Sequence, residues 1–168
     1  EHFREIALKL KPICKQYNVP LIINDNVKLA KEIDADGVHL GQDDLDIKAA
    51  REYLGADKII GVSAHNVKEA LEAENGGADY LGSGAAFVTS TKTDAGAIDH
   101  KVLSDVAHSV KIPVVAIGGI NKDNISQLEG LGLDGVAVVS AIFAADDISS
   151  AVIDLKAKAE KAAESSSK

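Results

Sequence analysis

Residues 78–84 read Ala-Asp-Tyr-Leu-Gly-Ser-Gly, a short apolar run that starts after an aspartate and ends in glycines. The same approach to an apolar run recurs at residues 35–38, Ala-Asp-Gly-Val, and at residues 133–136, Leu-Asp-Gly-Val. Aspartate is a frequent turn residue, and a short apolar run after a turn is typical of a buried strand. The recurrence therefore predicts a repeated unit, with an aspartate turn at the edge of the sheet where each of these strands begins. The three aspartates are Asp36, Asp79 and Asp134.

Apolar runs of this kind are spread along the whole chain and are rich in β-branched residues. We expect strands over residues 19–25, 37–41, 58–63, 80–84, 113–119 and 135–141. Their nearly continuous apolar character is typical of strands that are buried on both faces of a parallel sheet. The amphipathic stretches that separate them predict helices over residues 27–33, 47–54, 67–75, 101–110 and 124–131. Two further helices are predicted near the ends, over residues 3–17 and 148–163.

The alternation of strands and helices predicts an α/β protein with right-handed crossovers between parallel strands. Pro20 and Pro113 stand at strand starts that are four strand–helix units apart, which favours a (β/α)8 barrel of the TIM type over an open doubly wound sheet. About six of the eight units fall within this chain, and we expect the missing strand, helix and strand to precede it. We predict one barrel domain over residues 1–161 and a frayed polar tail over residues 162–168.

Composition narrows the classes of partner. The chain has 168 residues and a formal net charge of -8, which disfavours binding to nucleic acid or to an anionic membrane surface. The net charge does not exclude small phosphorylated ligands, because a few local hydrogen-bond donors can hold them. Cys14 is the single cysteine, so no intramolecular disulfide can form. No apolar run approaches the roughly 20 residues of a membrane span, so we expect a cytoplasmic protein, monomeric or a homo-oligomer.

A loop with the chemistry of an anion site follows the run at residues 80–84. Glycine allows the backbone to approach a ligand closely, hydroxyl groups donate hydrogen bonds, and lysine supplies a point charge. The loop places these groups in sequence at Thr89, Ser90, Thr91 and Lys92. This pattern predicts a phosphate-binding loop.

Polar residues also follow the other strands, where barrels of this type bind their ligands. Asp25 and Asp44 follow two neighbouring strands, and two such carboxylates can share one Mg2+ that takes its other ligands from water and phosphates. The alternative is that each caps the helix that follows it, and Asp43 competes with Asp44 for either role.

The same ambiguity holds at three other strand ends. Gly119, Val139 and Ser140 follow the last two strands, where a phosphate site or tight turns with Ser140 as a helix cap are both expected. Ser63 is likewise a ligand-binding residue or a cap. His39 lies inside a strand, which favours a residue lining the barrel over a catalyst. No nucleophile–base pattern stands out, so the chemistry indicated is one in which a leaving group departs without a strong base.

Several of these segments together resemble the thiamine phosphate synthase family. The resemblance covers residues 3 to about 145, with the matching segments in the family's order. They are Ile22-Ile23-Asn24-Asp25, Gly37-Val38-His39-Leu40-Gly41-Gln42-Asp43-Asp44, Ile60-Gly61-Val62-Ser63, Gly82-x-Gly84 with Thr89-x-Thr91-Lys92-x-Asp94, Ala116-Ile117-Gly118-Gly119-Ile120, and Gly135-Val136-Ala137-Val138-Val139-Ser140.

The resemblance implies an enzyme that joins hydroxymethylpyrimidine diphosphate to thiazole phosphate, with Mg2+ as cofactor and small phosphorylated molecules as partners. Asp25 and Asp44 are similar to the family's Mg2+ ligands. Asn24, Ser63 and Lys92 are similar to the residues with which the family binds the pyrimidine diphosphate. Of these, Ser63 and Lys92 are the expected catalytic residues. The residues similar to the family's thiazole phosphate site are Thr89, Ser90, Thr91, Gly119, Val139 and Ser140.

Two alternatives accompany this interpretation. The related thiazole tautomerases carry a histidine just after the glycine of the fourth strand end, where Ala85 stands here. The family's N-terminal strands and its Gln-x-Arg-x-x-Lys-like pyrophosphate clamp have no match in this sequence, so a non-catalytic phosphate-binding remnant is the second alternative.

Overall fold

The computed structural model describes residues 2–88 and 97–165, in which strands and helices alternate. The elements are α1 (His2–Gln16), β1 (Ile22–Asn24), α2 (Val27–Glu32), β2 (Gly37–Leu40), α3 (Ile47–Leu54), β3 (Ile59–Ser63), α4 (Val67–Gly76), β4 (Tyr80–Gly84), α5 (His100–Ser109), β5 (Val114–Ile117), the 3-10 helix η1 (Ile125–Leu128), β6 (Gly135–Ala137), α6 (Ser140–Phe143) and α7 (Ile148–Glu164).

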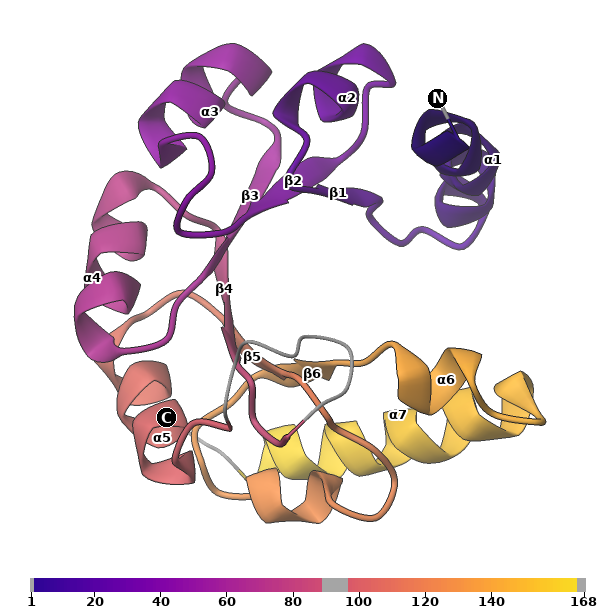
Figure 1. Cartoon of the computed structure of the whole chain (residues 1–168), viewed down its shortest axis with the longest axis vertical. Helices are drawn as coiled ribbons and strands as arrows, with labels where there is room; N and C mark the ends of the chain where they lie inside the picture. Colours follow the sequence, from indigo (N-terminus) through magenta and orange to yellow (C-terminus); the bar gives the residue numbers. More distant parts are fainter. Residues whose placement is uncertain (1, 89–96, 166–168) are drawn as a thin grey trace.

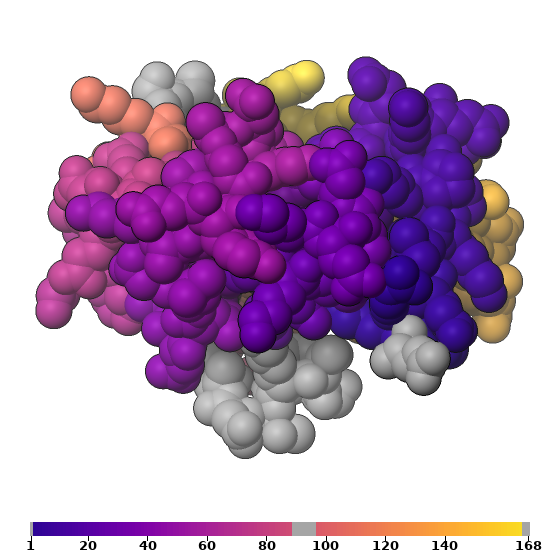
Figure 2. Space-filling view, turned by 90° about the horizontal axis from the view of Figure 1, so that it is seen from above, coloured from indigo at the N-terminus to yellow at the C-terminus, as the bar shows by residue number. Residues whose placement is uncertain are grey.

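The six strands form one parallel sheet in the order β1-β2-β3-β4-β5-β6. Figure 1 shows the sheet curving into a half-barrel with α2, α3, α4 and α5 along its outer side, while α1 and α6 lie at its two ends. Figure 2, a view from above, shows the segments from α2 to α4 as one continuous surface with the N-terminal segment at one end of it. The predicted α/β class with parallel strands is therefore confirmed, in the form of a half-barrel.

The two faces of the sheet have different chemistry, which follows from the side-chain alternation of a strand. The outer face packs against the helices and carries buried aliphatic residues such as Val38, Leu40 and Leu81. The inner face is mixed, with glycine and polar residues concentrated in β2, β3 and β4 and aliphatic residues at Ile22, Ile59, Val115 and Ile117. In strand order these inner residues are Ile22, Asn24, Gly37, His39, Ile59, Gly61, Ser63, Tyr80, Gly82, Gly84, Val115, Ile117, Gly135 and Ala137.

The recurring aspartates bind the strands together at the edge where the strands begin. The Asp79 carboxylate accepts a hydrogen bond from the Ile60 backbone N–H at 2.7 Å, and the Asp79 N–H donates to the Ile60 carbonyl at 2.8 Å. Asp36 makes the same pair of bonds with Leu21, and Asp134 makes it with Val114. We call this arrangement the aspartate clamp. The predicted turn role of these aspartates is confirmed, and their position in the sheet is set by two bonds each.

Several predicted boundaries need correction. Residues 124–131 do not form an α-helix; a 3-10 helix covers Ile125–Leu128, because the Asn124 side chain turns back to the Gly119 carbonyl and Gly130 has a positive φ of 76°. The last strand ends at Ala137 instead of residue 141, since Val139 leaves the extended conformation and Ser140 begins α6. The first strand is limited to Ile22–Asn24.

The C-terminal helix is longer than expected. α7 runs from Ile148 to Glu164, and Ala162 is buried against the core. Residues 162–164 therefore belong to the helix and not to a frayed tail. Among the described residues, no helix combines the length and the apolar character that crossing a membrane requires.

Candidate functional site

The first part of the candidate site lies at the ends of β1 and β2. Asn24 is the last residue of β1 on the inner face of the sheet, and its neighbour across the ladder is His39. The Asp25 N–H donates to the His39 carbonyl at 2.8 Å, so Asp25 stands directly beside the end of β2. Asp25 does not cap α2, because the side chain of Asn26 accepts the capping bond from the Leu29 N–H. Its positive φ of 60° lies in the left-handed region, which aspartate and asparagine adopt more readily than other residues with a side chain.

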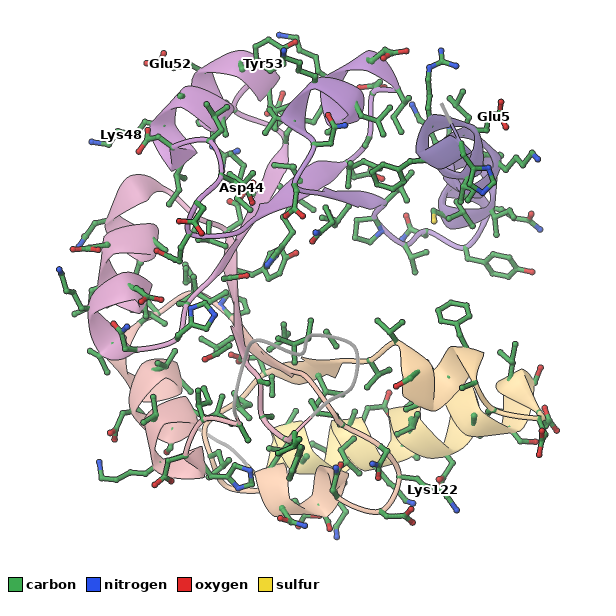
Figure 3. All side chains as sticks on the ribbon, viewed as in Figure 1. Glu5, Asp44, Lys48, Glu52, Tyr53 and Lys122 are labelled. Atoms are coloured by element: carbon green, nitrogen blue, oxygen red, sulfur yellow. The ribbon has the colours of Figure 1, made fainter. Side chains whose placement is uncertain are left out.

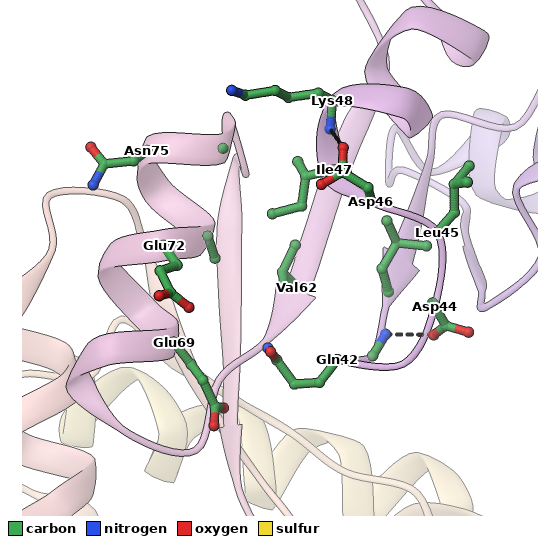
Figure 4. Close-up of a pocket in the computed structure, with 14 residues that line it drawn as sticks. Gln42, Asp44, Leu45, Asp46, Ile47, Lys48, Val62, Glu69, Glu72 and Asn75 are labelled. Carbon is green, nitrogen blue, oxygen red and sulfur yellow. Dashed lines mark hydrogen bonds between the residues drawn. The ribbon is translucent and has the colours of Figure 1, made fainter.

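Asp44 lies on the connection from β2 to α3 and folds back onto the strand end. Its Oδ2 accepts a hydrogen bond from the Gly41 N–H at 2.6 Å, which closes the turn and fixes the carboxylate beside β2 (Figures 3 and 4). The cap of α3 is Asp46, whose side chain accepts from the Lys48 and Ala49 N–H groups. The capping alternative for Asp25 and Asp44 therefore fails, and both carboxylates remain at the β1–β2 end.

Ser63 ends β3 and joins this group through hydrogen bonds. Its hydroxyl lies 3.0 Å from His39 Nε2, and the Gln42 side-chain amide donates to the Ser63 backbone carbonyl. Asn66 caps α4, so Ser63 is not the cap that one alternative expected. His39 lines the inner face, as its position inside a strand predicted.

The second part of the site lies at the ends of β4, β5 and β6. The chain after β4 is bonded to the end of β5, since the Ala86 N–H donates to Ile117 and the Phe87 N–H to Gly118. Gly119 has a positive φ of 65°, and a Cβ atom there would lie 2.7 Å from the Val88 carbonyl oxygen, so only glycine fits. The predicted phosphate-loop residues Thr89, Ser90, Thr91 and Lys92 continue from Val88 and lie outside the described residues.

Val139 and Ser140 stand beside this turn because Ile117 pairs with Ala137 in the β5–β6 ladder. Val139 takes the N-cap position of α6 and makes no side-chain capping bond, and Ser140 is the first helical residue. Ser140 is exposed at the start of α6, three residues after the end of β6. The interpretation of Ser140 as a helix cap is therefore wrong.

A groove of about 410 Å³ lies outside this rim, between the 41–46 connection and helices α3 and α4 (Figure 4). Its charged lining is mostly acidic, with Asp44, Asp46, Glu69 and Glu72 against Lys48. Apart from Asp44, which also stands at the β1–β2 end, these acidic side chains make the groove poorly suited to a phosphate.

Carboxylates alone do not form a complete metal cage here. Among residues 2–88 and 97–165, no group of three or more His, Cys, Asp or Glu side chains comes together as a metal site. In phosphate-handling sites Mg2+ is usually held by one or two carboxylates and completed by waters and substrate phosphates, so Asp25 and Asp44 are the residues at this end of the sheet that could hold it.

Some residues that shape the site were not singled out by the sequence. Gln42 holds the end of β3, Asn124 donates to the Gly119 carbonyl at 2.9 Å, and Tyr80 bonds His39 at 3.0 Å. The signal for Tyr80 is the presence of glycine on the inner face of both β3 (Gly61) and β4 (Gly82), which leaves room on that face for large rings.

The half-barrel defines a class: a parallel α/β protein of the kind that binds small-molecule ligands at the carboxyl ends of its strands. The profile of the thiamine monophosphate synthase family matches residues 1–142. The chain is 56% identical to the thiamine-phosphate synthase of Clostridium acetobutylicum over 146 residues, covering 87% of this chain and 69% of that protein. It is 54% identical to that of Methanobrevibacter smithii over 143 residues, covering 85% of this chain and 68% of that protein.

Solved structures agree with the sequence relatives. The thiamine phosphate pyrophosphorylase of Pyrococcus furiosus superposes with a TM-score of 0.87 at 43% identity and covers 96% of this chain and 77% of its own. A 3-hexulose-6-phosphate synthase superposes with a TM-score of 0.67 at 17% identity, a likeness of fold alone. The chain belongs to the thiamine monophosphate synthase family. The prediction of an enzyme of thiamine phosphate synthesis is confirmed, and these relatives favour neither alternative.

Proposed function

We propose that the inner rim of this half-barrel joins hydroxymethylpyrimidine diphosphate to thiazole phosphate and releases pyrophosphate. The observation that carries the proposal is the division of the rim into two polar groups. Asn24, Asp25, Asp44 and Ser63 gather at the β1–β3 end, and Gly119 and Ser140 gather at the β5–β6 end. Two phosphorylated substrates need two such places on one rim.

The β1–β3 group suits the diphosphate. The Ser63 hydroxyl and the Asn24 amide supply uncharged donors, and Asp25 and Asp44 would hold Mg2+ against the phosphates. When bound, Mg2+ stabilises the negative charge that develops on departing pyrophosphate. Lys92 would add a cation from the loop that follows β4.

The β5–β6 group suits the thiazole phosphate. Gly119 has a backbone conformation that other residues avoid, and Ser140 is an exposed hydroxyl residue that follows the neighbouring strand β6. Thr89, Ser90, Thr91 and the Val139 backbone would complete the donors around this phosphate. In the reaction that we propose, the pyrimidine C–O bond breaks, its electron pair leaves with pyrophosphate, and the thiazole nitrogen lone pair forms the new C–N bond.

We further propose that the sheet is part of an eight-unit barrel in the complete protein. In the described chain β1 and β6 each pair on one side only, and the Clostridium acetobutylicum relative is longer than the region that this chain matches, which is 69% of its length. An unpaired edge of a buried parallel sheet is costly, which supports further strands between β1 and β6.

The test uses the full-length protein and measures thiamine phosphate formation with and without Mg2+. Asp25→Ala and Asp44→Ala should each slow turnover by at least ~100-fold, and excess EDTA should stop it. Asp43→Ala is the matched control, because this exposed neighbour carries the same charge and should leave the rate unchanged. Full turnover in EDTA, or equal effects of Asp43→Ala and Asp44→Ala, would contradict the metal assignment.

A further inference from the structure

Three side chains from three adjacent strands form a continuous hydrogen-bonded line across the inner face of the sheet. Tyr80 at the start of β4 places its hydroxyl 3.0 Å from His39 Nδ1 on β2. The other ring nitrogen, His39 Nε2, lies 3.0 Å from the Ser63 hydroxyl at the end of β3. The line therefore runs from the start of β4, across the inner face, to the rim at the end of β3.

Glycines in β3 and β4 leave room for the side chains of this line. Tyr80 reaches His39 by crossing β3 at Gly61, where an added Cβ atom would lie 2.1 Å from the tyrosine Cζ. An added Cβ at Gly82 would lie 3.1 Å from His39 Cε1. The two rings also touch, with centroids 5.5 Å apart. β3 and β4 thus have glycine at the positions that the two rings cover. Glycine inside a strand weakens it, so a sheet that needed only apolar packing would be expected to carry side chains there.

The protons of the line can be assigned from its chemistry. A neutral imidazole has one donor and one acceptor nitrogen, whereas tyrosine and serine hydroxyls can play either role. Burial raises the pKa of Tyr80, so its hydroxyl keeps its proton at neutral pH. If Tyr80 O–H donates to Nδ1, the proton of the imidazole sits on Nε2 and is donated to the Ser63 oxygen. The Ser63 proton then points away from the histidine and is available to a ligand.

The reverse order suits an anion less well. If the Ser63 hydroxyl donates to Nε2, it presents only lone pairs to the rim, and these repel a phosphate oxygen. A ligand that is a diphosphate therefore selects the order in which every proton points from Tyr80 toward the rim. Such hydrogen-bond chains polarise one another, so the last donor is strengthened.

We propose that His39, oriented by Tyr80, is a positioning residue that makes Ser63 a directed hydrogen-bond donor to the diphosphate. The inference rests on the proposed function, in which Ser63 contacts that group. His39 acts through Ser63 and touches no reacting atom.

The test is a double-mutant cycle on the full-length protein, with two readouts. The first is calorimetric binding of inorganic pyrophosphate in the presence of Mg2+, and the second is kcat/KM for the pyrimidine diphosphate. Ser63→Ala and His39→Leu should each weaken both by about 10- to 100-fold, the range for one hydrogen bond to a charged group. In the Ser63→Ala protein, His39→Leu should cost nothing more, because its partner is already absent.

Conservative variants separate positioning from packing. His39→Gln keeps an N–H donor near the place of Nε2 and should recover most of the loss, and Tyr80→Phe should cost less than His39→Leu. The KM for thiazole phosphate should not change in any of them. His108→Leu with Ser104→Ala, a histidine–serine pair on the outer side of α5, is the matched control.

The outcomes are distinguishable. The positioning role would be overturned if the fold-losses of Ser63→Ala and His39→Leu multiplied in the double variant. It would also be overturned if His39→Gln recovered nothing, or if the KM for thiazole phosphate rose equally. Absence of pyrophosphate binding by the unmodified protein would also overturn it. Pyrophosphate binding without formation of thiamine phosphate would refute the proposed function alone, and the binding cycle would still decide the role of His39.

Discussion

The aspartate clamp of β3 and β4 should be worth a measurable share of the stability of this protein. The Asp79 carboxylate accepts from the Ile60 N–H at 2.7 Å and from the Arg51 guanidinium at 2.7 Å. Ile60 is fully buried in the intact protein, and the Asp79 carboxylate is the acceptor of its N–H. Asp79→Ala therefore leaves a buried donor without an acceptor.

The magnitude follows from the two bonds that are lost. A buried donor without a partner costs about 1–3 kcal/mol. The ion pair adds little, about 0–1 kcal/mol, because the Asp79 side chain is 47% exposed and Arg51 keeps its bonds to the Lys58 and Gly77 carbonyls. We expect Asp79→Ala to lower the free energy of unfolding by about 2–3 kcal/mol. Asp79→Asn keeps an oxygen acceptor for the Ile60 N–H and should cost about 1 kcal/mol.

Urea unfolding of the full-length protein, followed by far-UV circular dichroism, measures these differences. Asp57→Ala is the control, since Asp57 is exposed and its substitution removes the same charge. The clamp lies at the opposite edge of the sheet from the site, so kcat and KM at 25 °C should not change in any variant.

The result that would refute this reasoning is a small or nonspecific effect. If Asp79→Ala were no more destabilising than Asp57→Ala, the carboxylate would not be the partner on which the Ile60 N–H depends. If Asp79→Asn cost as much as Asp79→Ala, charge and not hydrogen bonding would be the source of the stabilisation.

Two further predictions concern pH and phosphate binding. Burial pushes the pKa of the Glu69 carboxyl upward, but hydrogen bonds from His65 and Asn66 outweigh it and hold the pKa below its ordinary value. Its stabilising contribution is therefore complete above that ordinary value and is lost as pH falls through the lowered pKa. Glu69→Gln should cost about 1–2 kcal/mol in urea unfolding at pH 7 and progressively less as pH falls below the ordinary carboxyl value. A cost that does not change with pH would contradict this. Ser140→Glu should weaken calorimetric binding of thiazole phosphate by at least about tenfold through like-charge repulsion, while Ser149→Glu on the exposed start of α7 should not; equal binding by both would contradict the phosphate role of Ser140.

The sequence predicted the elements well where periodicity and turn chemistry agree. β2, β4 and α3 lie within the ranges expected from apolar runs and amphipathic spacing. The pattern failed over residues 124–131, where the Asn124 side chain and the glycines that follow restrict the segment to a single 3-10 turn. Local side-chain bonds of this kind compete with a helix and leave no trace in hydrophobic periodicity.

The candidate site was predicted in part because parallel strands bring their carboxyl ends to one edge. That rule places Asp25, Asp44 and Ser63 at one edge of the sheet without any structure. It does not decide which aspartate caps a helix, because Asp44 and Asp46 look alike in sequence and only Asp46 reaches free N–H groups of α3. Nor does it reveal that Tyr80 crosses a neighbouring strand, since such a contact depends on the stagger between strands.

The aspartate clamp has a consequence for how the strands are aligned. Each clamp joins one aspartate to one residue by two opposed bonds, and a slip of a single residue would break both. The clamps occur within the pairs β1–β2, β3–β4 and β5–β6, so the smallest unit with a fixed alignment is two strands and the helix between them. A duplicated unit of that size would arrive with its alignment already set. The residues at the carboxyl ends of its strands could then change to suit a new ligand without altering the alignment of the strands.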